Sequence, residues 1–245
     1  MLNCLWPKAP LNPVLANDEV HIWCIDLDDP VDDAGTMPGS SHLSGDEQAR
    51  AARFRFERVR RRFIAGRGQL RMILGRYLNL SPGELKFKYL PAGKPELMDE
   101  ESLRFNLSNS EGTALVAVTR NLEVGIDLES IHPFPDLLQV AQQFFAQSER
   151  VELEALPADQ RLEVFFRVWT RKEAYLKARG DGLSTPLDQF SVSLAPETPS
   201  RLLTSNIGPA ELSRWVLHTL TPIPGFTGTL AVEGQSVGIV HWRME

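Results

Sequence analysis

A short segment of the chain occurs twice, and this repeat limits the folds that the sequence can adopt. Four residues recur at one constant offset of 104 positions, Asn17, Glu19, Val20 and Ile22 as Asn121, Glu123, Val124 and Ile126. Four identities within six residues indicate a diverged internal duplication. We therefore expect two lobes of similar size, an N-terminal lobe over residues 1–119 and a C-terminal lobe over residues 120–245.

The two halves show the same expected order of elements. Each begins with a strand rich in β-branched residues, at residues 19–27 and 122–130. A serine-led helix start follows, at Ser44 and at Ser148, and then a long helix, over residues 58–79 and 161–179. Shorter strands complete each half, at residues 85–90, 114–119, 190–194, 215–220, 228–233 and 237–242. The sequence thus predicts an α+β fold of two lobes related by a pseudo-twofold axis, each a small, mostly antiparallel sheet packed with helices, with an active site in the cleft between them.

Composition excludes several classes of protein. Hydrophobic residues make up 42% and charged residues 24% of the 245 positions, which is typical of a globular protein with a large core. No apolar run approaches the ~20 residues of a membrane-spanning helix, and the N-terminal segment lacks the pattern of a secretory signal. We expect a cytoplasmic protein with no membrane partner. Cys4, Cys24 and the five scattered histidines lack the spacing of a zinc site.

Positive charge is concentrated in one short region. The formal net charge of the chain is −6, yet ten arginines fall between Arg50 and Arg76 against a single acid, Glu57. A cluster of this kind favours an anionic partner, which is either a small phosphate ligand or a nucleic acid. The arginines therefore leave open a nucleic-acid-binding protein as the alternative to an enzyme with a small phosphate ligand. Against this alternative, the chain as a whole is acidic and contains no known nucleic-acid recognition motif.

Two acids lie close together in the expected strand at residues 122–130. Asp127 and Glu129 are two positions apart, so both side chains project from the same face of that strand. Carboxylate oxygens in such an arrangement suit a hard cation such as Mg²⁺, which typically takes one or two carboxylates together with substrate phosphates. The alternative interpretation is a strand end with two solvated acids.

A second group of polar residues lies on the expected helix at 161–179. Trp169, Glu173 and Lys177 are spaced by four, so they lie along one face of the helix. An exposed Glu–Lys pair would contribute only ~0.3–0.5 kcal/mol and carry no function. The neighbouring large apolar residues instead predict a buried glutamate, which needs a cation beside it.

Residues 105–110, Phe-Asn-Leu-Ser-Asn-Ser, form a third polar group before the strand expected at 114–119. Hydroxyl, amide and backbone N–H groups at such a position can bind phosphate oxygens. Clusters of Ser and Asn more often form ordinary turns.

Together these groups occur in the order and spacing of a known family. The chain resembles the 4′-phosphopantetheinyl transferases of the surfactin-synthetase-associated (Sfp-like) class over nearly its whole length, through residues 105–110, Val124–Glu129, the segment Phe-Phe-Ala-Gln-Ser-Glu at 144–149 and residues 165–192. The resemblance implies transfer of the phosphopantetheine arm of coenzyme A to a serine of an apo acyl or peptidyl carrier protein, releasing 3′,5′-adenosine bisphosphate. It also implies a Mg²⁺ ion, with Mn²⁺ as an alternative ion, in the cleft.

The resemblance assigns the metal and catalytic residues. Asp127, Glu129 and Glu173 match the metal-binding carboxylates of the family, and Lys177 matches a lysine that contacts the phosphates. A positive ion and a lysine at this position would stabilise the charge that develops on the pyrophosphate. Glu173 or Glu129, or a metal-bound water, would accept the proton of the carrier serine, and the sequence does not distinguish between them.

Five further residues match positions that bind coenzyme A. Lys94 matches a lysine near the nucleotide end, Ser108 a serine that holds the 3′-phosphate, and Arg50 a basic position on that phosphate. Arg62 falls in the helical Arg-x-x-x-Gly stretch. The family has histidine where this chain has Asn109, so a neutral amide replaces a charge-assisted contact, which is roughly twice as strong. In addition, Glu47 stands where another basic residue of the family could lie. We therefore expect either weaker binding of the nucleotide end of coenzyme A or compensation by the surrounding arginines.

The carrier-docking surface is predicted from apolar spacing. Residues 137–145 form an apolar stripe at helical spacing, shortly after the strand that carries Asp127 and Glu129, and this stripe is a candidate surface for the carrier protein. The alternative is that the stripe belongs to the hydrophobic core. A non-catalytic relative that binds carriers is a second alternative, but such a relative should have lost one of the three carboxylates, and all three are present. A magnesium-dependent phosphohydrolase that uses the same acids stays open. Because one chain contains both lobes, we expect a monomer.

Overall fold

The computed structural model describes residues 4–28, 39–180, 182, 185–195 and 198–244. Its first half contains β1 (Glu19–Asp26), α1 (Gly45–Ala51), α2 (Glu57–Leu78), β2 (Phe87–Tyr89), β3 (Pro95–Leu97), β4 (Leu103–Ser110) and β5 (Thr113–Arg120). The second half contains β6 (Val124–Ser130), α3 (Leu137–Phe144), α4 (Gln147–Ala155), α5 (Ala158–Arg179), β7 (Phe190–Val192), β8 (Leu202–Ser205), α6 (Ala210–Arg214), β9 (Trp215–Leu220), β10 (Phe226–Glu233) and β11 (Gly238–Arg243).

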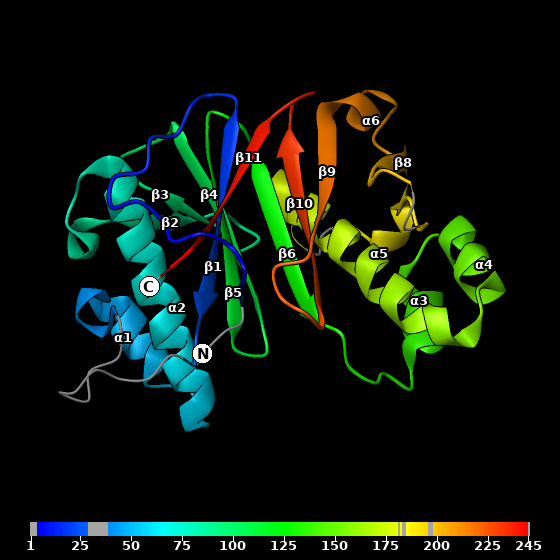
Figure 1. The fold of residues 1–245 in the computed structure, drawn as a ribbon, viewed down its shortest axis with the longest axis horizontal. Coiled ribbons are helices and arrows are strands. Elements are labelled where there is room, and N and C mark those ends of the chain that lie inside the picture. The colour runs from blue at the N-terminus through cyan, green and yellow to red at the C-terminus, as the bar shows by residue number, and fades with distance from the viewer. Residues whose placement is uncertain (1–3, 29–38, 181, 183–184, 196–197, 245) are drawn as a thin grey trace.

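Two sheets lie side by side in the middle of the molecule, with α2 on the outer side of one and α5 on the outer side of the other (Figure 1). The first sheet has the strand order β11-β1-β5-β4 and the second β6-β10-β9. One apolar cluster lies beneath each long helix, and a third joins the sheets through Ile22, Leu115, Ile126 and Leu230. The α+β fold of small sheets packed with helices is confirmed.

The duplication is visible in the topology. The order β1-β5-β4 in the first sheet corresponds to β6-β10-β9 in the second, because in each half, β11 apart, the initial strand pairs with the last strand, which pairs with the penultimate one. In both halves a 22-residue helix follows the initial strand, and a two-stranded hairpin follows the helix. The two halves of the chain therefore share one order of elements.

A buried ion pair repeats at matching places of the two halves. The carboxylate comes from a short helix, the cation from the long helix and an aromatic ring from the hairpin strand that follows. The contacts are Glu47 to Arg71 (2.7 Å) with Arg71 over Phe87 (5.0 Å), and Glu149 to Lys172 (2.7 Å) with Lys172 over Phe190 (4.4 Å). A buried carboxylate needs such a cation, because an unpaired charge in the core is strongly destabilising.

Three local features differ from the sequence-based expectation. The helix expected to start at Ser148 begins at Gln147, with Ala146 in the N-cap position and the Glu149 carboxylate accepting the Ala146 N–H. Residues 103–110 are a strand, β4, where the sequence indicated only a polar patch. The last strand, β11, pairs in parallel with β1 and so completes the sheet of the first half.

None of the helices described is both long and apolar enough to span a lipid bilayer.

Candidate active site

Strand β6 presents Asp127 and Glu129 to the neighbouring strand β4. The Ser108 hydroxyl donates to Asp127 Oδ1 (2.9 Å), and the Ser110 hydroxyl donates to Glu129 Oε2 (3.1 Å). Both acids thus lie on one face of β6, as their spacing predicted. Asp127 is 3% exposed and Glu129 is half-buried, so the interpretation as two solvated acids is wrong.

Helix α5 brings the second group of polar residues to the same place. Lys177 Nζ donates to Asp127 Oδ1 (2.6 Å) and to Ser108 Oγ (3.0 Å). This approach depends on Gly125, since a Cβ there would lie 2.1 Å from the carbonyl oxygen of Ala174. The absence of a side chain at Gly125 therefore lets the backbones of β6 and α5 touch.

The negative charge of Asp127 acts on the two other carboxylates of the site. Burial raises the pKa of Glu129 and of Glu173, and the negative charge of Asp127 raises both further, while the Lys177 ammonium opposes the shifts. Asp127 Oδ2 is buried and has no hydrogen-bond partner among the described residues. The site therefore concentrates negative charge that one lysine balances only in part.

Asp127, Glu129 and Glu173 have the donor chemistry of a site for a divalent cation. In the described part of the chain, no three His, Cys, Asp or Glu side chains are arranged to hold one metal ion together. The chemistry of the donors nevertheless suits a hard cation, because all three are carboxylates and one buried oxygen, Asp127 Oδ2, lacks a partner. Asp127 Oδ1 is already bound by the Lys177 ammonium.

A cationic cavity of about 310 Å³ lies between α2, β4 and the loop before β3. Three arginines and Asn109 line it, and the arginines are Arg50, Arg62 and Arg67. The structure thus brings together three of the residues that the resemblance assigned to coenzyme A, namely Arg50, Arg62 and Asn109. Ser108 does not line this cavity, because its hydroxyl faces Asp127 and Lys177.

Acidic side chains bind several arginines of the basic segment. Arg62 pairs with Asp28 (2.6 Å), and this contact lowers the pKa of the Asp28 carboxyl. Glu47 is 2% exposed and pairs with both Arg67 and Arg71. Glu47 therefore anchors two arginines of α2. The segment is not a uniform face of free cations, which weakens the nucleic-acid alternative.

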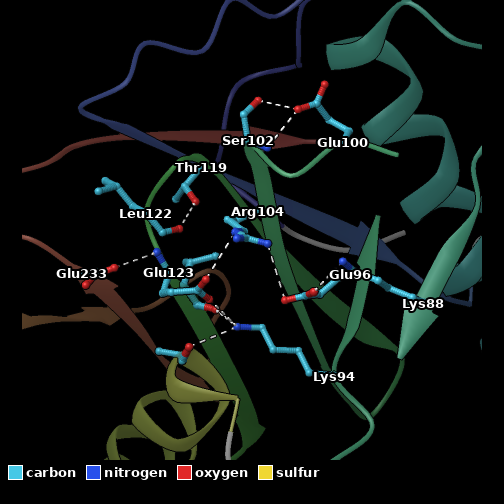
Figure 2. A network of polar contacts seen from close by, with 12 residues as sticks. Lys88, Lys94, Glu96, Glu100, Ser102, Arg104, Thr119, Leu122, Glu123 and Glu233 are labelled. Atoms are coloured by element: carbon cyan, nitrogen blue, oxygen red, sulfur yellow. Dashed lines mark hydrogen bonds and ion pairs between the residues drawn. The ribbon is translucent and has the colours of Figure 1, made fainter. Parts of the chain in front are cut away.

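Lys94 lies in a network of polar contacts between the lobes (Figure 2). Its Nζ donates to Glu123 Oε2 (3.3 Å) and to the carbonyl oxygens of Val124 (3.1 Å) and Ala178 (3.2 Å). Burial lowers the pKa of the Lys94 ammonium, while Glu123 raises it. Lys94 thus ties the loop before β3 to the start of β6 and the end of α5.

An apolar pocket of about 210 Å³ adjoins the carboxylates. It is lined by Glu129 and His132 together with apolar residues, namely Phe134, Val140, Phe165, Phe166 and Trp169. The apolar stripe at 137–145 divides between core and surface. Leu137, Ala141 and Phe145 are buried, whereas Leu138 is 39% exposed.

Sequence reasoning missed the contributions of Ser110 and Gly125. Ser110 belongs to a Ser/Asn-rich segment that also fits a turn, so no local signal marked it as a partner of Glu129. Gly125 lies within the segment Val124–Glu129, but nothing in the sequence shows that a strand and a helix approach each other closely at this residue.

Comparison with known proteins identifies the family of the chain. The family model of the 4′-phosphopantetheinyl transferase superfamily matches residues 123–235. The chain is 45% identical to the 4′-phosphopantetheinyl transferase HetI of Nostoc sp. over 96% of both chains, and 30% identical to the transferase Sfp of Bacillus subtilis over 71% of this chain and 77% of Sfp. It is 38% identical to the transferase AcpT of Escherichia coli over 49% of this chain and 58% of AcpT. The chain belongs to the 4′-phosphopantetheinyl transferase superfamily.

Proposed function

We propose that this protein transfers the 4′-phosphopantetheine arm of coenzyme A to a serine of an apo acyl or peptidyl carrier protein. The observation that carries the proposal is the group of Asp127, Glu129, Glu173 and Lys177, joined from β6 and α5 in a chain of this superfamily. We place the protein in the cytoplasm as a monomer with lobes 1–119 and 120–245, in which β11 returns to the first lobe.

Asp127, Glu129 and Glu173 would hold a Mg²⁺ or Mn²⁺ ion, which would neutralise charge on the pyrophosphate. Lys177 lies at the same carboxylates and is available to bind a phosphate oxygen, because it is a flexible point cation with three donors. The cationic cavity would bind the nucleotide end of coenzyme A through Arg50 and Arg62, with Asn109 as a neutral donor. Lys94 and Ser108, which the resemblance also assigns to coenzyme A, lie outside this cavity, and their side chains contact β6 and α5 instead.

In the reaction, the oxygen of the carrier serine forms a bond to the β-phosphorus while the bond from that phosphorus to the bridging oxygen breaks. The leaving group is 3′,5′-adenosine bisphosphate, and the serine proton passes to a carboxylate. Glu129 and Glu173 both suit this role, because burial and Asp127 raise the pKa of each toward the working pH. Lys177 stabilises the negative charge on the phosphates as it shifts toward the leaving group.

The apolar pocket beside Glu129, together with the exposed Leu138, would dock the carrier protein. Apolar contact is the expected source of affinity there, because an enzyme of net charge −6 gains little steering toward an acidic carrier.

Intact-mass analysis of several apo carriers, incubated with coenzyme A and Mg²⁺, tests the proposal. A transferase adds the mass of the phosphopantetheine arm to the carrier, and the same spectra show which carrier is preferred. Release of the arm without a gain in carrier mass would indicate a phosphohydrolase, and no change in either would refute both functions.

A further inference from the structure

Side chains of β4 join the two sheets at the carboxylate strand. Each described main-chain ladder of β4 is with β5, and each described ladder of β6 is with β10. Between β4 and β6, side-chain oxygens accept the main-chain N–H groups, Asn106 Oδ1 from Ile126 (2.8 Å), Ser108 Oγ from Leu128 (3.3 Å) and Ser110 Oγ from Ser130 (3.1 Å). We call these three contacts the β4–β6 seam.

The two serines of the seam have a second use for their hydroxyls. Each hydroxyl accepts an N–H through a lone pair, so its single proton stays available for donation. The Ser108 hydroxyl donates a hydrogen bond to Asp127, and the Ser110 hydroxyl donates one to Glu129. The seam therefore fixes the backbone of β6 and the direction of two carboxylates at once.

The Glu129 carboxylate has fewer hydrogen-bond donors than the Asp127 carboxylate, so its orientation depends more on the serine of β4. Asp127 also receives a hydrogen bond from Lys177. Within the described ranges, Ser110 Oγ is the one hydrogen-bond donor to the Glu129 carboxylate. The described hydrogen bond to the Glu129 carboxylate thus comes from β4.

We infer that Ser110 is a positioning residue that orients the Glu129 carboxylate toward the site shared with Asp127 and Glu173. This inference rests on the proposed function for its catalytic consequence. It goes beyond that function because it assigns to the first lobe a part in preparing a cation site whose carboxylates all come from the second.

The test compares Ser110→Ala with Ser110→Thr, which keeps a hydroxyl, and with Ser110→Cys, which keeps only a weak donor. Ser102→Ala is the matched control, because Ser102 also donates its hydroxyl to a glutamate (Glu100, 2.6 Å) but lies just before the opposite end of β4 (Figure 2). Binding of Mn²⁺ is measured by electron paramagnetic resonance without coenzyme A, and kcat and KM are measured separately for both substrates.

Loss of such an outer hydrogen bond to a metal ligand typically weakens affinity or activity about 10- to 100-fold. We expect a loss of that size in Mn²⁺ affinity and in kcat for Ser110→Ala, with little change in either KM. Ser110→Thr should restore most of the loss, Ser110→Cys should be intermediate, and Ser102→Ala should behave as the unchanged protein.

Unchanged Mn²⁺ affinity in Ser110→Ala, or a Ser110→Thr variant as weak as Ser110→Ala, would overturn the inference. If Ser110→Ala does not fold, Ser110→Cys decides, since a folded Cys variant with undiminished Mn²⁺ binding would also overturn it. The Mn²⁺ titration needs no turnover, so it stays informative even if the protein modifies no carrier.

Discussion

Asp127 interacts with each of the other charged residues of the site. It binds Lys177 directly, and its negative charge raises the pKa of both Glu129 and Glu173. Its Oδ2 has no partner among the described residues, so the present contacts use only half of the carboxylate. This arrangement is costly for a purely structural aspartate and suits one that binds a further positive group.

Replacement of Asp127 or Glu173 by alanine should abolish most of the transfer activity and leave the fold intact. Removing one strong electrostatic contact in an active site costs about 100- to 1,000-fold in kcat, and loss of a metal ligand should cost at least as much. Initial rates from the gain in carrier mass, with circular dichroism for the fold, provide the measurement. Near-normal turnover of both variants would refute the assignment of the carboxylates.

Glu173→Gln should stabilise the metal-free protein while it inactivates the enzyme. Burial and Asp127 raise the pKa of Glu173 above its ordinary value of 4.5, so the ionised form is disfavoured in the folded state. An acid with a raised folded-state pKa removes stability as the pH rises above its unfolded pKa, and glutamine avoids this loss. The urea midpoint of the variant should exceed that of the parent at pH 7, and the difference should shrink as the pH falls toward 4.5. An equal or lower midpoint at pH 7 would contradict the electrostatic interpretation.

At the scale of single residues, the sequence revealed the charges but not the contacts that hold them. The spacing of Asp127 and Glu129, and of Glu173 and Lys177, identified residues that the fold brings together. The partner of Glu129 could not be foreseen, because Ser110 acts across a junction between two sheets. Glu47 stood out only as an acid at a basic position of the family, and its role in holding Arg67 and Arg71 required the packed helices.

At the scale of elements, the contact between β6 and α5 sets the geometry of the site. Gly125 lies against the turn of α5 that runs from Ala174 to Ala178, between Glu173 and the end of the helix. A methyl group at Gly125 would come within 2.2 Å of the Ala178 nitrogen and would meet backbone, which cannot rotate away. The separation of the carboxylates on β6 from Glu173 therefore depends on the small size of one residue.

Gly125→Ala should impair both stability and transfer, because α5 must move away from β6. Overpacking in a core typically costs 1–3 kcal/mol. Thermal unfolding and rates of carrier modification measure the two effects. Gly45→Ala is a suitable control, since a Cβ at Gly45 meets no atom within 4 Å. A Gly125→Ala variant as stable and active as Gly45→Ala would show that the close approach is not required.

Helix α3 offers a test of the docking surface. Leu138→Gln removes an apolar contact from the exposed side of α3, while Leu137, Ala141 and the core remain in place. The KM for the carrier should rise, and the KM for coenzyme A should stay constant. A change confined to the KM for coenzyme A would show that the carrier protein does not dock at Leu138.

The regular elements were more predictable than the polar strand. Both 22-residue helices were expected within a few residues of their observed ends, because their apolar periodicity is long. β4 was missed because Asn is depleted in typical strands, and because clusters of Ser and Asn more often form turns. These residues occur in β4 because their side chains pair with β6, a tertiary reason that no local pattern contains.

At the scale of the whole molecule, the second half of the chain repeats the element order of the first half and then adds one strand to the sheet of the first half. Each half supplies a strand–helix–hairpin–two-strand unit, but the chain then adds β11 to the sheet of the first half. β11 pairs in parallel with β1 from Glu19–Gly238 to Cys24–Arg243, and Trp242 packs against the core beneath α2. The repeat at a 104-residue offset predicted two similar lobes, but it contained no information on this return, since β11 has no counterpart in the first half.

The return of β11 should make the first lobe dependent on the end of the chain. Residues 1–119 alone lack the strand that covers one edge of β1 and the apolar face shared with β6 and β10. We expect this fragment to be unfolded or aggregated, because an open edge and an uncovered apolar face favour association. Co-expression with residues 120–245 should yield a soluble complex that modifies carriers. Co-expression with residues 120–235, which keep every carboxylate of the site but lack β11, should not. A cooperative urea transition of residues 1–119 alone, or equal recovery with either partner fragment, would show that β11 is dispensable for the first lobe.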